Sequence, residues 1–154
     1  MLQLNLMLGT AIIVICVSFH VAGLAYTTPI LRAIAGAGTH PSRRHRVLFV
    51  MIFAVLVVIA LHTVEIWAWA AVFWYIGEFE QFEAALYFSA VTATTLGYGD
   101  LTLSQQWRIR GPFEAMGGLI LSGASTAYLL PVMQGLFDAL FLHSGFEPIF
   151  EDET

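Results

Sequence analysis

The residues with the clearest chemical potential form one short stretch, Thr94 to Asp100, which reads Thr-Thr-Leu-Gly-Tyr-Gly-Asp. Two glycines, Gly97 and Gly99, flank a single aromatic residue in it. Because glycine adopts positive φ as readily as negative φ, alternating it with other residues permits backbone carbonyls that all face one way. A row of carbonyls without partners in its own chain is costly at membrane depth. A dehydrated cation would satisfy that row, so the stretch predicts a cation site built from carbonyl oxygens.

A second candidate for chemistry is the pair His62 and Glu65, which share one helical face because they stand three residues apart. Ionisable residues inside an apolar segment are functional candidates by default. The pair predicts a brace or a pH-sensitive contact behind the cation site. In the alternative interpretation, Glu65 reaches the outer membrane interface and His62 bonds a neighbouring helix.

A metal site at this pair is not predicted. Carboxylate metal sites in helix bundles combine Glu-x-x-His motifs from two helices with further glutamates. Here the order of the two residues is reversed, and the chain contains no second pair of this kind. His20, the only ionisable side chain in the first apolar segment, is expected to bond a neighbouring helix as the neutral imidazole.

The composition places these residues in a membrane. The 154 residues, a length typical of one domain, are 58% hydrophobic and 11% charged, against about 25% charged residues in a soluble domain. The formal net charge is −5 and the chain has no lysine, so binding to nucleic acid, which needs a basic face, is excluded. The single cysteine, Cys16, permits no intrachain disulfide.

Three apolar segments are long enough to cross the hydrocarbon core, which takes about 20 helical residues. They cover 2–30, 47–75 and 111–142. Residues 82–94 read as a helix that is too short to cross. Such a short helix and the loop after it form a re-entrant hairpin, which a bilayer tolerates only where it is buried in protein or lines water. This arrangement indicates a pore.

The arginines predict the orientation of the chain. Four of the six arginines lie between Arg32 and Arg46, and positively charged loops stay in the cytoplasm. The N-terminus is therefore expected outside, and the C-terminus inside, a cell (inner) membrane. Arg43, Arg44 and Arg46 could also bind anionic lipid headgroups.

Residues from about 82 to 136 resemble the pore region of potassium channels. The resemblance rests on Thr95-Leu96-Gly97-Tyr98-Gly99, which matches the Thr-Val-Gly-Tyr-Gly selectivity filter except at Leu96. It implies that K⁺ binds the carbonyl oxygens of Thr95, Leu96, Gly97 and Tyr98, and that the Thr95 hydroxyl closes the innermost site. It also implies that Tyr98 packs outward against the pore helix. Because one chain supplies one wall, the implied unit is a homotetramer with no cofactor besides K⁺.

The resemblance divides the chain into an additional N-terminal transmembrane helix over 1–31, a cytoplasmic basic loop over 32–46, a pore domain over 47–142 and a short acidic cytoplasmic tail over 143–154. The pore domain contains an outer helix over 47–75, a pore helix over 82–94, the filter over 95–99 and an inner helix over 111–142. The expected fold is thus all-α, with three transmembrane helices and a re-entrant pore helix, assembled around a four-fold axis.

Other residues are expected to support the filter. Thr94, Tyr87, Val91 and Asp100 surround it in sequence. Val91 stands where some relatives carry a glutamate that braces the aspartate after the filter, so Asp100 needs another partner, and Tyr87, Trp107 and Arg108 are the candidates. Gly123 and Pro131 are candidate gate hinges in the inner helix.

The sequence predicts a passive potassium-selective channel and no enzyme. The competing hypotheses are a weakly selective cation channel, a subunit of a potassium transporter, and a non-conducting accessory membrane protein that retains a pore fold. Transporter repeats keep only a degenerate filter, so the complete Gly97-Tyr98-Gly99 argues against the second of these.

Overall fold

The computed structural model describes residues 2–36 and 43–138 of the chain. The described part contains four helices: α1 over Leu2–Gly36, α2 over Arg43–Tyr75, α3 over Phe82–Ala93 and α4 over Arg110–Phe137. Three spans are long and apolar enough to cross a membrane, namely Leu2–Gly36, His45–Tyr75 and Arg110–Gly135. The predicted all-α architecture with three transmembrane helices is therefore confirmed, and the chain is a multi-pass membrane protein.

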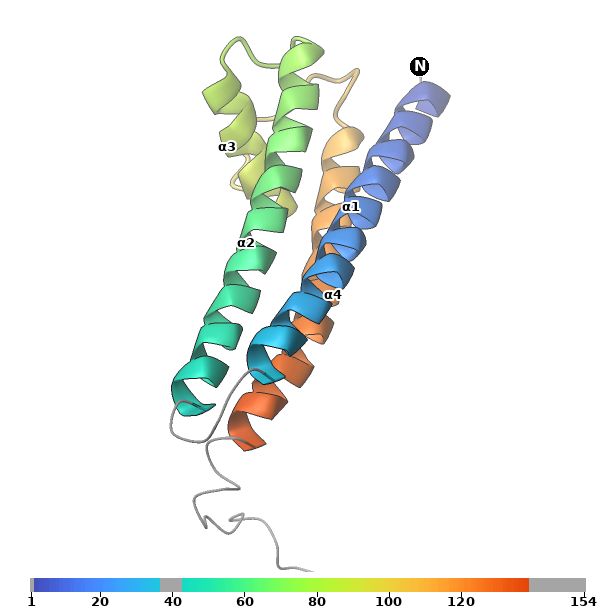
Figure 1. Cartoon of the computed structure of the whole chain (residues 1–154). Coiled ribbons are helices and arrows are strands. Elements are labelled where there is room, and N and C mark those ends of the chain that lie inside the picture. Colours follow the sequence, from blue (N-terminus) through green and yellow to red (C-terminus); the bar gives the residue numbers. More distant parts are fainter. Residues whose placement is uncertain (1, 37–42, 139–154) are drawn as a thin grey trace, which may run out of the picture.

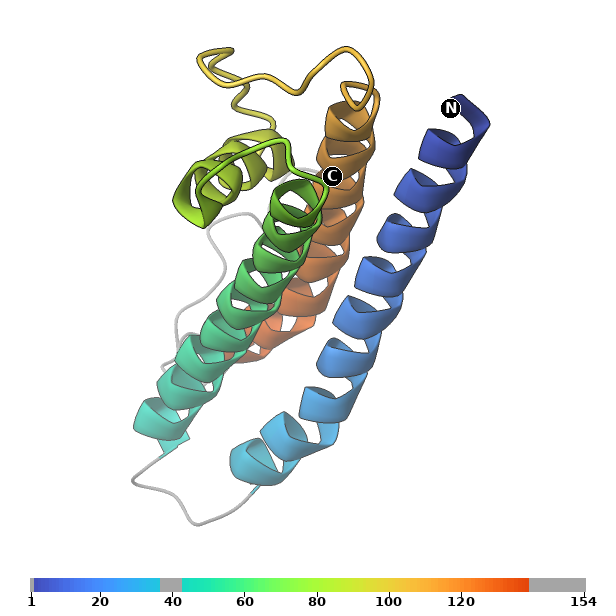
Figure 2. The same cartoon turned by 90° about the horizontal axis from the view of Figure 1, so that it is seen from above.

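The three long helices run side by side, and the short α3 lies at one end of them (Figure 1). The N-terminal end of α1 lies at that same end. α1 packs against both α2 and α4 but makes no contact with α3. Seen from above, α1 and α3 lie on opposite sides of the α2–α4 pair (Figure 2). The additional helix therefore supports the back of the pair that holds α3.

The predicted loop over 32–46 is wrong at both ends. Residues 32–36 continue α1, and residues 43–46 begin α2. Charge marks the side of the membrane on which a segment lies, but it does not end a helix, and arginine is among the better helix formers. The predicted boundary of the first helix at residue 31 is therefore wrong as well, because α1 continues to Gly36. Pro29 does not end the helix either, since it lies inside α1. The remainder of this segment, 37–42, lies outside the described residues.

Glycine ends α2 at the turn that leads to α3. Gly77 has φ +79°, a left-handed conformation that glycine adopts without steric cost. Backbone hydrogen bonds join Gly77 N to Trp74 O and Glu78 N to Phe73 O, each at 3.1 Å. The second of these closes the helix terminus in the manner of a Schellman motif. The chain then reverses, and α3 begins at Phe82, with Glu83 in the first turn.

The main buried core packs α3 onto the long helices. Phe88 of α3 meets Phe73 of α2 edge-on, with ring centroids 5.3 Å apart. Ile13 and Cys16 of α1 belong to the same buried cluster. α4 begins at Arg110 with Pro112 in its first turn, where a missing N–H costs nothing. The predicted inner helix extends to 142; α4 ends at Phe137, and 139–142 lie outside the described residues.

Candidate ion-binding site

The loop that follows α3 folds back on the end of that helix. The amides of Leu96 and Gly97 both donate to the carbonyl of Val91, at 3.0 and 3.2 Å. The Thr94 hydroxyl donates to the Ala90 carbonyl at 2.7 Å. Two of the residues predicted to support the loop, Val91 and Thr94, therefore hold its first turn by backbone carbonyl and side-chain hydroxyl respectively.

The sign of φ alternates along this loop. Thr95, Gly97 and Gly99 have φ of +60°, +56° and +77°, whereas Leu96 and Tyr98 between them do not have positive φ. Positive φ is unusual for threonine, because its branched side chain crowds the backbone there. Such strain persists only where the surroundings impose it, and it gathers at functional sites. Alternation of this kind lets successive carbonyls face one side.

Tyr87 is the partner of Asp100. Its hydroxyl donates to Asp100 Oδ2 at 2.7 Å. This hydrogen bond is the chief reason that the pKa of Asp100 is lowered, and it also raises the pKa of Tyr87. Of the other two candidates, Trp107 instead stacks under Arg110, whose guanidinium carbon lies 4.3 Å from the ring centroid.

The whole loop lies open on the surface of a single chain. Every residue from 94 to 100 is exposed. Tyr98 is 66% exposed. Packing of Tyr98 against its own pore helix, which the resemblance implies, is thus not complete within one chain.

A carboxylate that sequence reasoning overlooked supports the pore helix from behind. Glu114 of α4 is 1% exposed, and the Ser89 hydroxyl of α3 donates to its Oε1. Ser89 Oγ also lies 2.8 Å from the Ile66 carbonyl of α2. Ser89 therefore ties α3 to both neighbouring helices. Glu114 could have been noticed as the one acidic residue between Pro112 and Leu136, since an ionisable group inside a span is a functional candidate.

α4 approaches the end of α3 most closely at Gly118. A Cβ placed there would lie 2.1 Å from the Ala93 carbonyl oxygen. Gly117 is less constrained, since its Cβ would lie 3.4 Å from Ile13 of α1. Only glycine at 118 lets the inner helix come this near to the residue before the filter loop.

His62 and Glu65 lie in a buried cluster that also contains His20 and Ser125. His20 Nδ1 lies 2.8 Å from Glu65 Oε1, and His62 Nδ1 lies 3.4 Å from Glu65 Oε2. Ser125 Oγ lies 2.9 Å from His20 Nε2 and 3.0 Å from His62 Nε2. Glu65 is 4% exposed, so the alternative in which it reaches the outer interface is wrong. Ser125 is 4% exposed and lies between the two imidazoles.

A cavity of about 210 Å³ connects this cluster with the base of the filter loop. His62, Glu65 and Glu114 line it, and so do Ala93 and Thr94. The pair predicted to lie behind the cation site thus shares a cavity with Ala93 and Thr94, the residues that lead into the loop.

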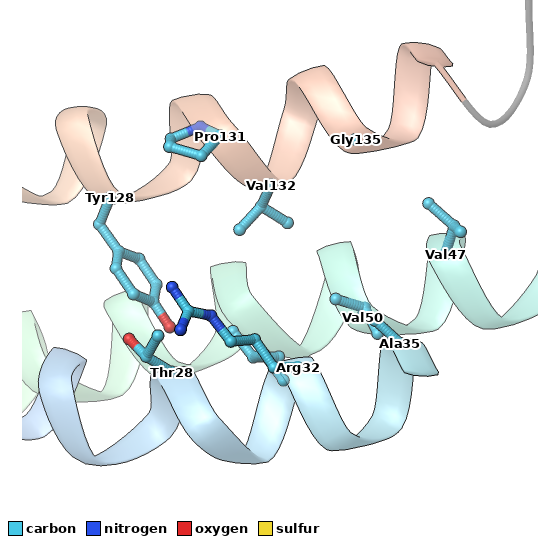
Figure 3. A pocket seen from close by; sticks show the side chains of 10 residues that line it. Thr28, Arg32, Ala35, Val47, Val50, Tyr128, Pro131, Val132 and Gly135 are labelled. Carbon is cyan, nitrogen blue, oxygen red and sulfur yellow. The ribbon is translucent and has the colours of Figure 1, made fainter. Parts of the chain in front are cut away.

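The two candidate hinges in α4 differ in their surroundings. A Cβ at Gly123 would meet nothing within 4 Å. Pro131 lies inside α4 and lines a cavity of about 420 Å³ at the end of the helices away from the filter loop. Figure 3 shows Arg32 of α1 extending across this cavity toward Tyr128 of α4. The side chains of Arg43 and Arg44, predicted to meet lipid headgroups, lie outside the described residues.

At the opposite end, Glu78 organises the segment that follows the loop over 94–100. Its carboxylate accepts from the Ser104 amide at 2.6 Å and from the Ser104 hydroxyl at 2.7 Å. The residue therefore joins the turn before α3 to the segment that leads into α4.

Comparison with known proteins identifies the family. A family model described as "Ion channel" matches residues 47–135. The match begins within α2 and continues through α3 and the filter loop into α4, but it excludes α1. No curated protein and no solved structure matches the chain. Because the family match covers more than half of the 154 residues, the chain belongs to this family of ion channels.

Proposed function

We propose that the protein is a passive potassium-selective channel in which the carbonyls of Thr95, Leu96, Gly97 and Tyr98 coordinate K⁺. The observation that carries this proposal is the alternation of φ at Thr95, Gly97 and Gly99 in a loop that follows a re-entrant helix. Rings of backbone carbonyls replace the hydration shell of the ion in potassium channels. The same oxygens would otherwise be costly at membrane depth.

Four copies of the chain complete the site in this proposal. One chain provides one row of carbonyls, and ion coordination in a filter of this kind takes four loops. The exposure of residues 94–100 on a single chain supports an arrangement in which these residues meet other copies around an axis. Tyr98 then packs between copies and sets the width of the filter.

The orientation proposed from the arginines puts the filter near the outer face. The N-terminal end of α1 and the filter loop lie at the same end of the helices, and the arginines at 32 and 46 lie near the other end of α1 and α2. Positively charged segments favour the cytoplasmic side. Ions would therefore meet Tyr98 and Gly99 first from outside.

Flux into liposomes tests the proposal. The purified protein in liposomes should carry K⁺ down its gradient, Na⁺ should not substitute, and Ba²⁺ should block. Gly97→Ala should abolish this flux, because alanine is strained at φ +56°. Gly36→Ala is the matched control, since its Cβ would meet nothing within 4 Å and it lies in α1. Equal flux of K⁺ and Na⁺ through the wild type would contradict the proposal.

A further inference from the structure

The cluster of His20, His62 and Glu65 brings three metal-ligating side chains from two helices to one point, where His20 and Glu65 are buried and His62 is half-buried. Their ligand atoms all lie within 4.8 Å of one another. His20 is the one histidine of α1, and the family match does not include α1. Sequence spacing revealed only the pair on α2, because the third group comes from a helix 45 positions earlier in the chain.

With Glu65 ionised and both imidazoles neutral, the hydrogens of the cluster leave one electron-pair donor without a partner. Both Nε2 atoms face Ser125 Oγ, and a hydroxyl has one hydrogen to donate. At least one imidazole must therefore carry its own hydrogen on Nε2. A neutral imidazole in that form has a bare lone pair on Nδ1, and both Nδ1 atoms face the carboxylate of Glu65.

The contact between His62 and Glu65 identifies where this lone pair lies. Glu65 Oε2 is buried and has no hydrogen-bond partner among the described residues. It faces His62 Nδ1 at 3.4 Å, which is longer than the usual 2.7–3.2 Å of an N–H···O hydrogen bond. Two electron-pair donors that face each other repel, and a proton or a metal ion between them removes that repulsion.

The separations suit a tetrahedral metal ion. Zinc binds histidine nitrogen and carboxylate oxygen at about 2.0–2.1 Å, so neighbouring ligand atoms in a tetrahedron lie about 3.3 Å apart. The 3.4 Å between His62 Nδ1 and Glu65 Oε2 is close to this spacing. The 2.8 Å between His20 Nδ1 and Glu65 Oε1 is shorter, so metal binding would replace that hydrogen bond and widen the contact by about 0.5 Å.

We propose that His20 Nδ1, His62 Nδ1 and the Glu65 carboxylate bind a divalent transition-metal ion between α1 and α2, and that Zn²⁺ is the ion that fits this site best. Two histidines and a glutamate are an established zinc ligand set that leaves a fourth position open. Ser125 accepts the Nε2 hydrogens of both imidazoles and so fixes the ring form that directs Nδ1 at the metal. Outer hydrogen bonds of this kind orient most metal-binding histidines.

The cavity behind the proposed filter leaves room for a fourth ligand of the metal ion, and it contains a second carboxylate. His62 and Glu65 line it together with Glu114, whose Oε2 is buried and unpartnered among the described residues. A divalent cation beside two carboxylates gives no formal net charge at a site inside the bilayer. The same ion would link the additional helix to the channel unit.

Metal binding to the purified full chain tests this proposal without any measurement of ion flux. The reference protein replaces the other three histidines (His40→Gln, His45→Gln, His143→Gln), which leaves the cluster intact. After dialysis against Zn²⁺ it should retain one ion per chain by elemental analysis. X-ray absorption should show nitrogen and oxygen ligands with two imidazoles and no sulfur. No bound zinc, or a sulfur ligand from Cys16, would overturn the proposal.

Variants of the cluster in the same background identify the ligands. His20→Gln, His62→Gln and Glu65→Gln should each abolish stoichiometric Zn²⁺ binding. Ser125→Ala should weaken it by about 10–100-fold, the usual loss for an outer-shell partner. If all four variants bound Zn²⁺ as the reference protein does, the site would lie elsewhere and the proposal would be wrong. Gel filtration separates loss of binding from loss of folding, and the reference protein tests the proposal even where a variant fails to fold.

Discussion

Residues around the proposed filter act mainly by holding the backbone in place. The amides of Leu96 and Gly97 donate to the Val91 carbonyl of α3. Tyr87, which lies earlier in the same helix, donates its hydroxyl hydrogen to Asp100. Val91 offers this aspartate no carboxylate as a brace, and the Tyr87 hydroxyl makes the contact. The filter loop is therefore attached to its own pore helix at both of its ends.

The bond between Tyr87 and Asp100 predicts a response to external acid. Because the folded state lowers the pKa of Asp100, this group contributes stability above its ordinary pKa, and the contribution is lost as the pH falls through the lowered value. Tyr87→Phe should raise the pKa of Asp100 toward its ordinary value. The acid-induced loss of current should then begin at a higher pH in the variant, as recordings across a series of external pH values would show.

Trp107→Phe is the control for this experiment, since Trp107 contacts Arg110 rather than Asp100. An identical acid response in wild type and Tyr87→Phe would mean that Asp100 is not held by Tyr87 in the conducting channel.

At the scale of elements, three polar or close contacts fix the pore helix. α3 bonds to α2 and α4 through Ser89, and α4 approaches its end at Gly118. On the far side of the α2–α4 pair, the cluster around Glu65 joins α1 to both helices. These contacts lie inside the bundle, where a polar group without a partner is costly.

Loss of the serine hydroxyl should destabilise the protein. Ser89→Ala leaves the buried Glu114 without its hydrogen-bond donor, and an unsatisfied buried group costs about 1–3 kcal/mol. Thermal unfolding in detergent should show a lowered midpoint. In the double variant Ser89→Ala/Glu114→Gln, the two losses should not add, because they remove one shared interaction. Strict additivity would mean that the two residues act independently.

Glycine at position 118 should be required for the position of α3. Gly118→Ala places a methyl group against the Ala93 carbonyl, and overpacking of this kind costs about 1–3 kcal/mol. The unfolding midpoint should fall. Gly123→Ala is the matched control in the same helix, as its Cβ meets nothing within 4 Å and alanine favours a helix. Equal midpoints for the two variants would show that the close approach is not maintained.

Much of this arrangement follows from the sequence, and the rest depends on which helices meet. Apolar length predicts the three spans, and the glycines after α3 predict the filter loop. The ends of the helices were harder to predict, because Arg32 and Arg43 are charged but arginine has no tendency to end a helix. The partners of His20 and Glu114 could not be predicted, since they lie on helices whose packing the local pattern does not specify. For the same reason, the sequence did not show that His20 joins His62 and Glu65 in the proposed metal site.

At the scale of the whole molecule, the single chain is one part of a larger assembly in our proposal. Its filter face is open, with Leu96 56% exposed and Leu119 of α4 61% exposed. In a membrane helix, exposed apolar groups can face lipid, but a filter backbone cannot. The additional helix α1 packs on the opposite side from α3, so it would surround the proposed tetramer rather than line its axis.

Assembly is tested by the mass of the purified protein. After correction for bound detergent, light scattering should give four times the 17.0 kDa of one chain. Cysteines introduced in place of Tyr98 should be joined between copies by a short bismaleimide, because the proposal places this side chain where neighbouring copies meet. The same change at Phe19 on α1, which is 46% exposed, should crosslink poorly. A monomeric mass would contradict the four-fold pore.

Potassium selectivity is the central claim, and the reversal potential under bi-ionic conditions tests it most directly. The wild-type protein is placed in a planar bilayer with K⁺ on one side and an equal concentration of Na⁺ on the other. A filter formed by Thr95 to Gly99 predicts a reversal potential shifted far toward the value at which K⁺ alone carries current. A reversal potential near zero would mean that the pore passes both ions equally and would contradict the account.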